Sequence, residues 1–342
     1  MEKKINIFMP DRFSGSLKLE KKLLGSKFNL ILGNCANEKY LKPNHLKTCN
    51  IILAWHDIKY TKKLIDKLPN CKAIVREGVG YDSVDIQYAA KKKIYVFNVP
   101  DYGVGEVADH TIGLFLSLLR KINFVNSELK KNLNKWHWSM FKGNKRTNKI
   151  TFGILGLGRI GTAVALRAKS LGCKVIFFDK YLKTGTNKSL GFYKVKSLKE
   201  LLLKSDVLSL HVPITNETQK ILNSKNLKNL KKNSILINTA RGELIDENYL
   251  TQLIQQKYFY GVGLDVLASE PPKNNLKIIK LWRSGRYNII LSPHGAFYSE
   301  ESYKEMRKKA VITAKNFILK KDLTNCVNLS YFQNYKNRII DI

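Results

Sequence analysis

The chain has 342 residues, and 60 Lys and Arg against 27 Asp and Glu give a formal net charge of +33. This length predicts two domains, and no apolar run approaches the ~20 residues of a membrane-spanning helix. The N-terminus is too short and too strand-like for a signal peptide, so we expect a cytoplasmic protein. Five cysteines without Cys-x-x-Cys spacing indicate reduced thiols and exclude a disulfide framework or a zinc site.

The positive charge has two interpretations: a polyanionic partner, or a composition biased toward lysine. Most of the basic residues are lysines, spread along the whole chain in twos and threes, without a long basic tail. Nucleic-acid modules usually cluster their charge and add arginines or stacking aromatics. We therefore favour compositional bias and expect neither a specific nucleic-acid partner nor a membrane partner.

Residues 1–100 alternate short apolar runs with helical stretches, which predicts a parallel sheet covered by helices. The candidate strands are residues 5–9, 28–32, 50–55, 73–76 and 94–98, and the clearest helical stretches are 61–68 and 84–92. In such open sheets, ligands bind at the carboxyl ends of the strands.

Two of these strand ends carry candidate substrate-binding residues. His56 follows the third strand, and Arg76 ends the fourth, just before Gly78-Val79-Gly80. Glycines on both sides of Val79 free backbone N–H groups for an anion, and an arginine is a bidentate donor for a carboxylate. Taken alone, the Gly-x-Gly turn is explained equally well as plain loop geometry.

Pro100 closes the fifth strand, and a long apolar helix through residues 111–121 is the best candidate for the connection between the domains. Residues 123–149 are polar, lysine-rich and irregular, yet they contain Trp136 and Trp138. Exposed tryptophans in such a segment predict an arm that buries them on a partner subunit or on the other domain.

Residues 153–161 contain Gly156, Gly158 and Gly161 in the G-x-G-x-x-G spacing, between a buried strand and a helical stretch. The first glycine allows a tight turn, the second lets a pyrophosphate approach, and the third lets helix and strand pack closely. The next strand ends in Asp179, which can bind a ribose diol and repels a 2′-phosphate, so NAD is favoured over NADP. Lys180 tempers this preference slightly.

The alternation continues to about residue 298, followed by a helix over 300–319 and a polar tail. We therefore predict an α/β protein with two parallel-sheet domains, Rossmann-like and flavodoxin-like, and an active site in the cleft between them. Residues 1–100 with 299–342 form the predicted substrate domain, and residues 101–298 form the predicted NAD-binding domain with a dimerisation arm near 123–149.

Three polar residues follow strands of this second domain: Arg241, Glu270 and His294. An arginine suits a carboxylate. A histidine paired with a glutamate is an acid/base unit, because the carboxylate orients the ring and favours its protonated form. Each residue alone is explained by a structural or solvated role, but three strand ends beside a dinucleotide loop favour an active site.

Together these motifs resemble the NAD-dependent D-isomer-specific 2-hydroxyacid dehydrogenases over about residues 45–330. The matching segments are 78–85, 98–110, the glycine loop, 236–247, 263–266, 270–271 and 292–296. Within that family, segments 164–170, 178–182, 297–301 and 325–328 are most similar to the C-terminal-binding-protein branch and its bacterial dehydrogenase relatives.

The resemblance implies the following roles. Arg241 holds the substrate carboxylate and carbonyl, His294 exchanges a proton with the substrate oxygen, and Glu270 pairs with His294. Further substrate contacts are implied for His56, Arg76, Val79, Gly80 and Phe297. Contacts with the cofactor NAD are implied for Gly156, Gly158, Arg159, Ile160, Gly161, Asp179, Val212, Pro213, Thr218, Thr239, Asp265 and His294, with no metal. The family is usually a homodimer.

Two positions depart from the pattern. Phe297 stands where the C-terminal-binding-protein branch, which consists of corepressors, typically has Trp. Val79 stands where the family usually has a small polar residue. We therefore predict an NAD(H)-dependent enzyme that interconverts a 2-keto acid and a D-2-hydroxy acid, with its particular substrate left open. The alternative is an NADH-sensing interaction scaffold of the corepressor type with little turnover.

Overall fold

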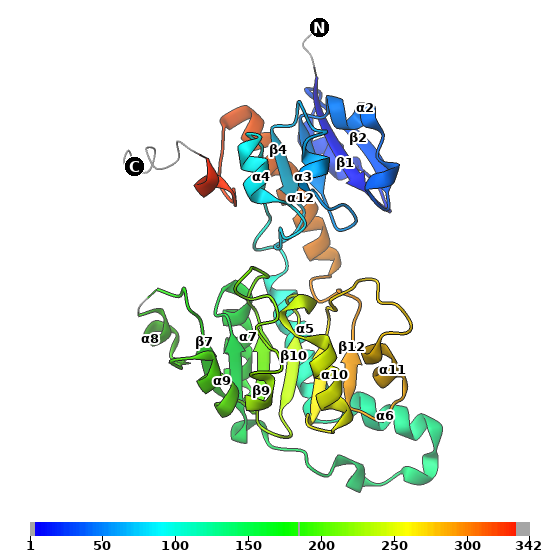
Figure 1. The fold of residues 1–342 in the computed structure, drawn as a ribbon, viewed down its shortest axis with the longest axis vertical. Coiled ribbons are helices and arrows are strands. Elements are labelled where there is room, and N and C mark those ends of the chain that lie inside the picture. Colours follow the sequence, from blue (N-terminus) through cyan, green and yellow to red (C-terminus); the bar gives the residue numbers. More distant parts are fainter. Residues whose placement is uncertain (1–3, 184, 333–342) are drawn as a thin grey trace. The chain divides into compact units, whose positions relative to one another are not determined.

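The computed structural model describes residues 4–183 and 185–332, and the chain divides into two compact units. One unit comprises residues 1–102 and 299–342, and the other comprises residues 103–298. Each contains a sheet whose strand pairs are all parallel (Figure 1), which confirms the predicted α/β fold class. The polar tail predicted after the last helix lies largely outside the described residues.

The first unit is built on a five-stranded sheet with the strand order β2-β1-β3-β4-β5. Its strands are β1 (Ile5–Asp11), β2 (Phe28–Cys35), β3 (Ile51–Ala54), β4 (Ala73–Arg76) and β5 (Tyr95–Phe97). Its helices are α1 (Lys18–Leu24), α2 (Pro43–Thr48), α3 (Lys62–Ile65), α4 (Ile86–Lys91) and α12 (Glu300–Lys320), with 3₁₀ turns at Glu38–Tyr40 and Leu329–Tyr331. This order is that of flavodoxin-like folds, in which β2 is added on one side of β1 and the later strands are added on the other side, so that the strand order reverses between β1 and β3.

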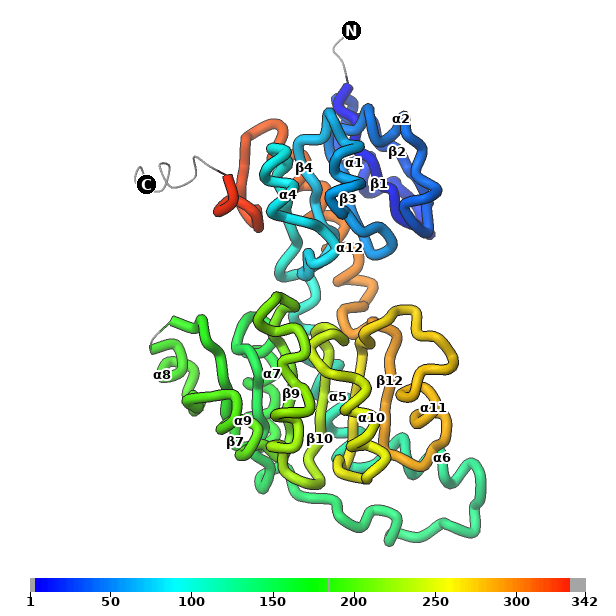
Figure 2. The backbone as a smooth tube through the Cα atoms, in the orientation of Figure 1, coloured from blue at the N-terminus to red at the C-terminus, as the bar shows by residue number. Residues whose placement is uncertain are grey.

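Helix α12 returns the end of the chain to the unit that the N-terminus begins, where it packs against α1, β3 and β4 (Figure 2). A capping box between Ser299 and Ser302 starts the helix. Where α12 packs against α1, Arg307 Nε donates to Glu20 Oε1 at 2.6 Å, and the Glu20 side chain is only 1% exposed. Removing either partner would leave a buried charge uncompensated, so this pair ties the two distant segments together.

The second unit is built on a seven-stranded sheet with the order β12-β11-β10-β9-β6-β7-β8. Its strands are β6 (Thr151–Leu155), β7 (Lys174–Phe178), β8 (Tyr193–Lys194), β9 (Val207–Leu210), β10 (Ile235–Asn238), β11 (Gly261–Leu264) and β12 (Ile289–Leu291). Its helices are α5 (Val104–Leu119), α6 (Ile122–Lys131), α7 (Arg159–Ser170), α8 (Thr186–Leu190), α9 (Leu198–Lys204), α10 (Glu247–Gln255) and α11 (Lys277–Arg283). The strand order reverses between β6 and β9, which is the ligand-binding point of doubly wound sheets.

Both faces of this sheet are buried, which explains the nearly continuous apolar strand sequences. Successive residues alternate between two cores: Val207 packs with α5 and α7, whereas Leu208 packs with α9, α10 and α11. The same alternation separates Ile235 from Leu236. In β6, β7 and β10 the polar residues, Thr151, Lys174 and Asn238, stand at strand ends, and the interior of β9 has only the buried hydroxyl of Ser209.

The irregular structure predicted for residues 123–149 is wrong at its start, because α6 occupies Ile122–Lys131 and buries Val125. After α6 the chain continues in three short 3₁₀ turns, Leu133–Lys135, Trp138–Phe141 and Thr147–Lys149. Trp136 and Trp138 are 76% and 72% exposed in the single chain. In the described residues, no helix has the length and apolar character needed to cross a membrane.

Candidate active site

The glycine loop lies between the end of β6 at Leu155 and the start of α7 at Arg159. Gly156 has a φ of 90°, and a Cβ there would lie only 2.7 Å from Val212 Cγ1. A Cβ on Gly161 would overlap the carbonyl oxygen of Gly156, whereas one on Gly158 would meet nothing within 4 Å. The first and third glycines are thus required by packing, and the second leaves open space at the N-terminus of α7, where a pyrophosphate would fit.

Asp179 follows β7 and connects two turns that lie at the carboxyl ends of neighbouring strands. Its Oδ2 accepts the N–H of Leu157 in the glycine loop at 2.8 Å. Its Oδ1 accepts the N–H groups of Tyr181 at 2.8 Å and Leu182 at 3.0 Å. The carboxylate is therefore held in a fixed position beside the glycine loop, as a group that binds a ribose diol must be.

The other predicted cofactor contacts follow β9 and β10. Thr218 Oγ1 donates to the carbonyl of Pro213 at 2.6 Å and accepts the N–H of Thr215 at 2.8 Å, which closes the loop after Val212. After β10, the hydroxyl of Thr239 lies 3.0 Å from that of Thr111 on α5. Because the strands are parallel, these loops lie at the same end of the sheet as the glycine loop, the end formed by the carboxyl ends of the strands. The first two residues of α7, Arg159 and Ile160, lie there as well.

At the next strand ends, the structure brings Glu270 and His294 together. Glu270 Oε2 lies 2.6 Å from His294 Nδ1, and Glu270 Oε1 accepts the N–H of Leu267 at 2.8 Å. Burial opposes ionisation of Glu270, but the hydrogen bond and charge of His294, the Leu267 N–H and the charge of Arg241 outweigh it and leave the pKa of Glu270 lowered. The pair is therefore a carboxylate that orients an imidazole and stabilises positive charge on it.

Arg241 follows β10 on a turn that packs directly against the Glu270 loop. The buried Asn238 braces this turn, since its Nδ2 donates to Arg241 O at 2.7 Å and its Oδ1 accepts the N–H of Ala240 at 3.0 Å. A Cβ on Gly242 would overlap the backbone of Leu267 and Ala268. Only glycine allows the two loops this close, which explains why glycine follows the arginine and why the charge of Arg241 reaches Glu270.

Asp265 fixes the loop that carries His294. Its side chain is 1% exposed, and it accepts hydrogen bonds from the hydroxyl of Ser292 at 2.6 Å and from the N–H groups of Gly295 and Ala296 at 3.0 Å each. Its backbone carbonyl accepts the N–H of His294 at 2.8 Å. His294 itself has a φ of 53°, a conformation that a non-glycine residue adopts only when its surroundings hold it there.

His110 and Ser292 are part of this network, although sequence reasoning missed both. His110 Nε2 lies 2.9 Å from the Ser292 hydroxyl, and 182 residues separate the two. Pairing over such a distance leaves no local signal in the sequence. One hint is that both residues lie within segments of the family resemblance, His110 at the end of 98–110 and Ser292 at the start of 292–296.

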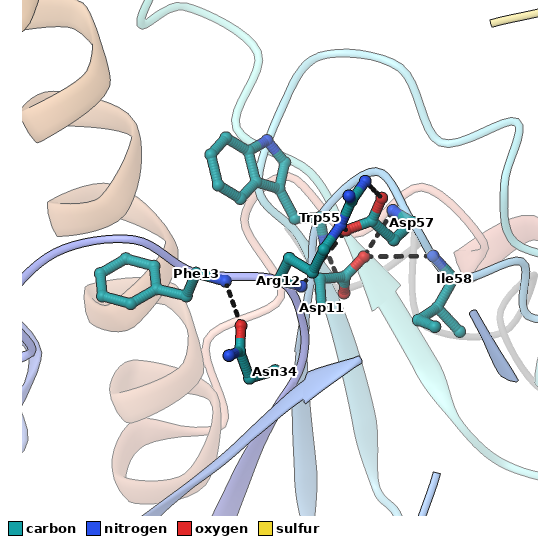
Figure 3. Close-up of polar contacts among 7 residues, drawn as sticks. All are labelled: Asp11, Arg12, Phe13, Asn34, Trp55, Asp57 and Ile58. Carbon is teal, nitrogen blue, oxygen red and sulfur yellow. Dashed lines mark hydrogen bonds and ion pairs between the residues drawn. The ribbon is translucent and has the colours of Figure 1, made fainter. Parts of the chain in front are cut away.

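In the first unit, Asp11 organises the loop of residues 55–58, which contains His56. Figure 3 shows Asp11 with Trp55, Asp57 and Ile58 of this loop. Its carboxylate accepts the N–H groups of Trp55 at 2.9 Å, Asp57 at 2.7 Å and Ile58 at 3.1 Å. Burial raises the pKa of Asp11, against the lowering effect of these three bonds and of Arg76. Arg12 adds a bidentate ion pair with Asp57, with donor–acceptor distances of 2.7 and 3.0 Å. Sequence reasoning also missed Asp11, which lies at the end of the first strand.

Arg76 is 5% exposed, and its guanidinium lies beneath the turn that follows β4. Its Nη1 donates to the carbonyls of Glu77 at 2.6 Å and Ala54 at 3.3 Å, and its Nη2 lies 3.3 Å from His56 Nδ1. Because a guanidinium only donates, His56 Nδ1 is the acceptor and the proton of the neutral ring sits on Nε2. Arg76 thus orients both the turn and His56.

The remaining predicted substrate contacts lie in turns. Val79 is 36% exposed, and its carbonyl accepts from Asn98 Nδ2 at 2.8 Å, which sets the orientation of the peptide before Gly80. Phe297 is half-buried in the second unit. The structure therefore places Val79 and Gly80 in the first unit and Phe297 in the second.

Comparison with known proteins shows to which family the chain belongs. Residues 112–296 match the model of the D-isomer specific 2-hydroxyacid dehydrogenase, NAD binding domain. The chain is 39% identical to a glyoxylate reductase from Thermococcus litoralis over 265 residues, which is 76% of this chain and 77% of that protein. It is 36% identical to a D-3-phosphoglycerate dehydrogenase from Methanocaldococcus jannaschii over 259 residues, 76% of this chain and 48% of that one.

A solved structure extends the similarity to both units. The D-lactate dehydrogenase from Aquifex aeolicus, complexed with NAD and lactic acid, is 31% identical, with a TM-score of 0.85 over 94% of this chain and 99% of that one. The matched NAD-binding domain confirms the predicted cofactor, NAD. The chain belongs to the family of D-isomer-specific 2-hydroxyacid dehydrogenases.

Proposed function

We propose that the protein is an NAD(H)-dependent enzyme that interconverts a 2-keto acid and a D-2-hydroxy acid. The observation that carries this proposal is the pair of Glu270 and His294, whose Oε2 and Nδ1 atoms are 2.6 Å apart. The pair lies after the carboxyl ends of strands in the sheet whose β6 leads into the glycine loop. A dinucleotide loop alone supports only binding, whereas an acid/base pair beside it supports hydride transfer coupled to proton transfer.

The residues divide the reaction among them as follows. The space at Gly158, the N-terminus of α7 and Asp179 would hold NAD, which supplies or accepts the hydride. Arg241 binds the substrate carboxylate and polarises its carbonyl. Nδ1 of His294 faces Glu270, and we assign Nε2, the other ring nitrogen, to the substrate oxygen. It donates a proton to that oxygen in reduction and accepts one in oxidation, and Glu270 stabilises the charged ring.

The substrate-binding groups of the first unit are proposed on sequence resemblance and local geometry. His56, with its proton on Nε2, is a hydrogen-bond donor, and the turn at Val79 and Gly80 offers backbone N–H groups to a carboxylate. Arg76 supports both elements from beneath. Phe297 of the second unit is proposed as an apolar wall for the substrate side chain. In this scheme residues 1–100 with 299–342 bind substrate and residues 101–298 bind NAD.

The test is to replace the two residues that would act on substrate. Arg241→Ala and His294→Ala should each lower kcat by about 10²–10⁴-fold on the best of a panel of 2-keto acids, while NADH binding survives. His137→Ala is the matched control, because the His137 side chain is exposed and its Nδ1 bonds to Ser139 in the segment of 3₁₀ turns after α6. Near-wild-type turnover in either active-site variant would contradict the assignment.

We further propose a cytoplasmic homodimer, supported by the 76% and 72% exposed rings of Trp136 and Trp138 in the predicted arm. The similarity to the corepressor branch leaves a second candidate, an NADH-sensing scaffold with little turnover. The substrate panel separates the two: NADH binding without turnover, together with capture of short peptides by residues 1–60, would favour the scaffold.

A further inference from the structure

Two residues directly after Asp179 are bound to a glutamate from another strand end. Lys180 Nζ lies 3.0 Å from Glu217 Oε2, and the Tyr181 hydroxyl donates to the same oxygen at 2.6 Å. The hydrogen bonds from Tyr181 and Lys180 hold the pKa of Glu217 below its usual range. Lys180 also lies over the Tyr181 ring, 5.3 Å from its centroid. We call these three side chains the Glu217 clamp.

The clamp connects the two loops that flank the proposed adenosine site. Lys180 and Tyr181 belong to the turn after β7, which Asp179 holds through the Tyr181 N–H. Glu217 belongs to the loop after β9, one residue before Thr218, whose hydroxyl closes that loop. Strand β6, which leads into the glycine loop, lies between β7 and β9 in the sheet. The clamp therefore joins loops from the two strands on either side of β6.

A cation at this place bears on the choice between the two nicotinamide cofactors. NADP differs from NAD by a phosphate on the ribose 2′-oxygen, and dinucleotide sites accommodate that phosphate with a basic residue beside the ribose. Lys180, adjacent to Asp179, is such a residue. In the clamp its ammonium is instead paired with Glu217.

We propose that Glu217 is a second determinant of cofactor selectivity, because it keeps the Lys180 ammonium in an ion pair and so denies it to a 2′-phosphate. This inference rests on the proposed role of Asp179 and the glycine loop in binding NAD. The selectivity against NADP then has two sources: direct repulsion by Asp179, and removal by Glu217 of the one cation next to it in sequence.

The expected effect is small and has a definite size. The side chains of Lys180 and Glu217 are 61% and 58% exposed, and exposed ion pairs change equilibria by up to about fivefold. Glu217→Gln should therefore tighten the binding of a 2′-phosphorylated nucleotide about two- to fivefold relative to its unphosphorylated counterpart. The gain should disappear when Lys180 is also removed.

The experiment uses the full chain and four variants: Glu217→Gln, Lys180→Met, the double variant, and Glu128→Gln. Calorimetric titrations with 2′,5′-ADP and 5′-AMP, and fluorescence titrations with NADPH and NADH, give the ratio of affinities without requiring turnover. Glu128 is the matched control, because it too accepts from two side chains, Lys131 and Lys135, but lies on α6. Circular dichroism verifies that each variant is folded.

The inference requires that the affinity for the 2′-phosphorylated nucleotide, divided by the affinity for its unphosphorylated counterpart, rise in Glu217→Gln. This ratio should stay at the wild-type value in Glu128→Gln. It is overturned if the ratio does not change, or if the gain persists in the double variant, since Lys180 would then have no part in it. Failure of the wild type to bind both 5′-AMP and NADH is a different outcome, which would contradict the proposed function itself.

Discussion

His294 and Glu270 are 24 residues apart in sequence, yet His294 Nδ1 and Glu270 Oε2 lie 2.6 Å apart. Each partner is held independently of the other. The N–H of Leu267 binds the second oxygen of Glu270, and the carbonyl of Asp265 binds the N–H of His294. The imidazole is therefore oriented before any ligand arrives, with Nε2 directed away from the carboxylate.

Replacing the carboxylate by an amide tests what its charge does. Glu270→Gln keeps the size and an oxygen for Nδ1 but removes the negative charge beside the imidazole, so we expect kcat for keto-acid reduction to fall about 10²-fold. Steady-state kinetics with a 2-keto acid and NADH measure this loss, and a wild-type kcat in Glu270→Gln would argue against the pairing.

The hydrogen bonds of Asp265 predict a loss of stability as well as activity. Asp265→Asn replaces one of two accepting oxygens by a donor that faces the N–H groups of the 292–296 loop, so buried donors lose their partner at a cost of about 2 kcal/mol. Ser292→Ala removes the hydrogen bond to the Asp265 carboxylate and the contact with His110 Nε2, and it should also cost about 2 kcal/mol. Urea unfolding measures both values, and equal stability of Asp265→Asn and the wild type would contradict the bracing role.

Asp179 carries the predicted preference for NAD. Asp179→Asn retains an oxygen for the backbone N–H groups but removes the charge that repels a 2′-phosphate, so the preference for NADH over NADPH should narrow about tenfold. The ratio of kcat/KM for the two cofactors measures this. Asp109→Asn, which breaks an ion pair with Arg167 on α7, is the control and should leave the ratio unchanged. Equal discrimination before and after would remove Asp179 from the role.

The sheets and the glycine loop were predictable because their signals are local. A buried strand is a short apolar run, and the close approach of Gly161 to the carbonyl oxygen of Gly156 lies within one turn, although Gly156 itself packs against the distant Val212. The start of α6 was missed, because only one of its residues, Val125, is buried and the segment is otherwise polar. Strand β11 ends at Leu264, and the side chain of the next residue, Asp265, binds the loop that follows β12.

The contacts around the candidate site were less predictable, because they join residues far apart in sequence. Asp11 binds backbone 44 to 47 residues away, and Glu217 meets Lys180 across 37 residues. Such pairs depend on which strands lie side by side, and that information is absent from any single motif. Residue type at a strand end indicates which groups are available, and only the sheet order indicates which of them meet.

Glu77 in the first unit predicts how stability depends on pH. It is buried beside Arg76, and burial, together with the charges of Glu20 and Asp11, raises its pKa to about 8. In the unfolded chain a glutamate has a pKa of about 4.3, so the folded state holds its proton more tightly. Between these two values unfolding releases a proton, and the free energy of unfolding must fall as pH rises until it levels off above pH 8.

Glu77→Gln cannot ionise and should lose this fall. Since a tenfold change in proton affinity is worth about 1.4 kcal/mol, the variant should exceed the wild type in stability by a few kcal/mol at pH 9, and by much less at pH 5. Urea unfolding at both pH values measures the difference. Glu305→Gln, which removes an exposed glutamate paired with Lys309 on α12, is the control and should follow the wild-type curve. If Glu77→Gln and the wild type lose stability in parallel from pH 5 to pH 9, another group is responsible for the fall and Glu77 is ionised throughout.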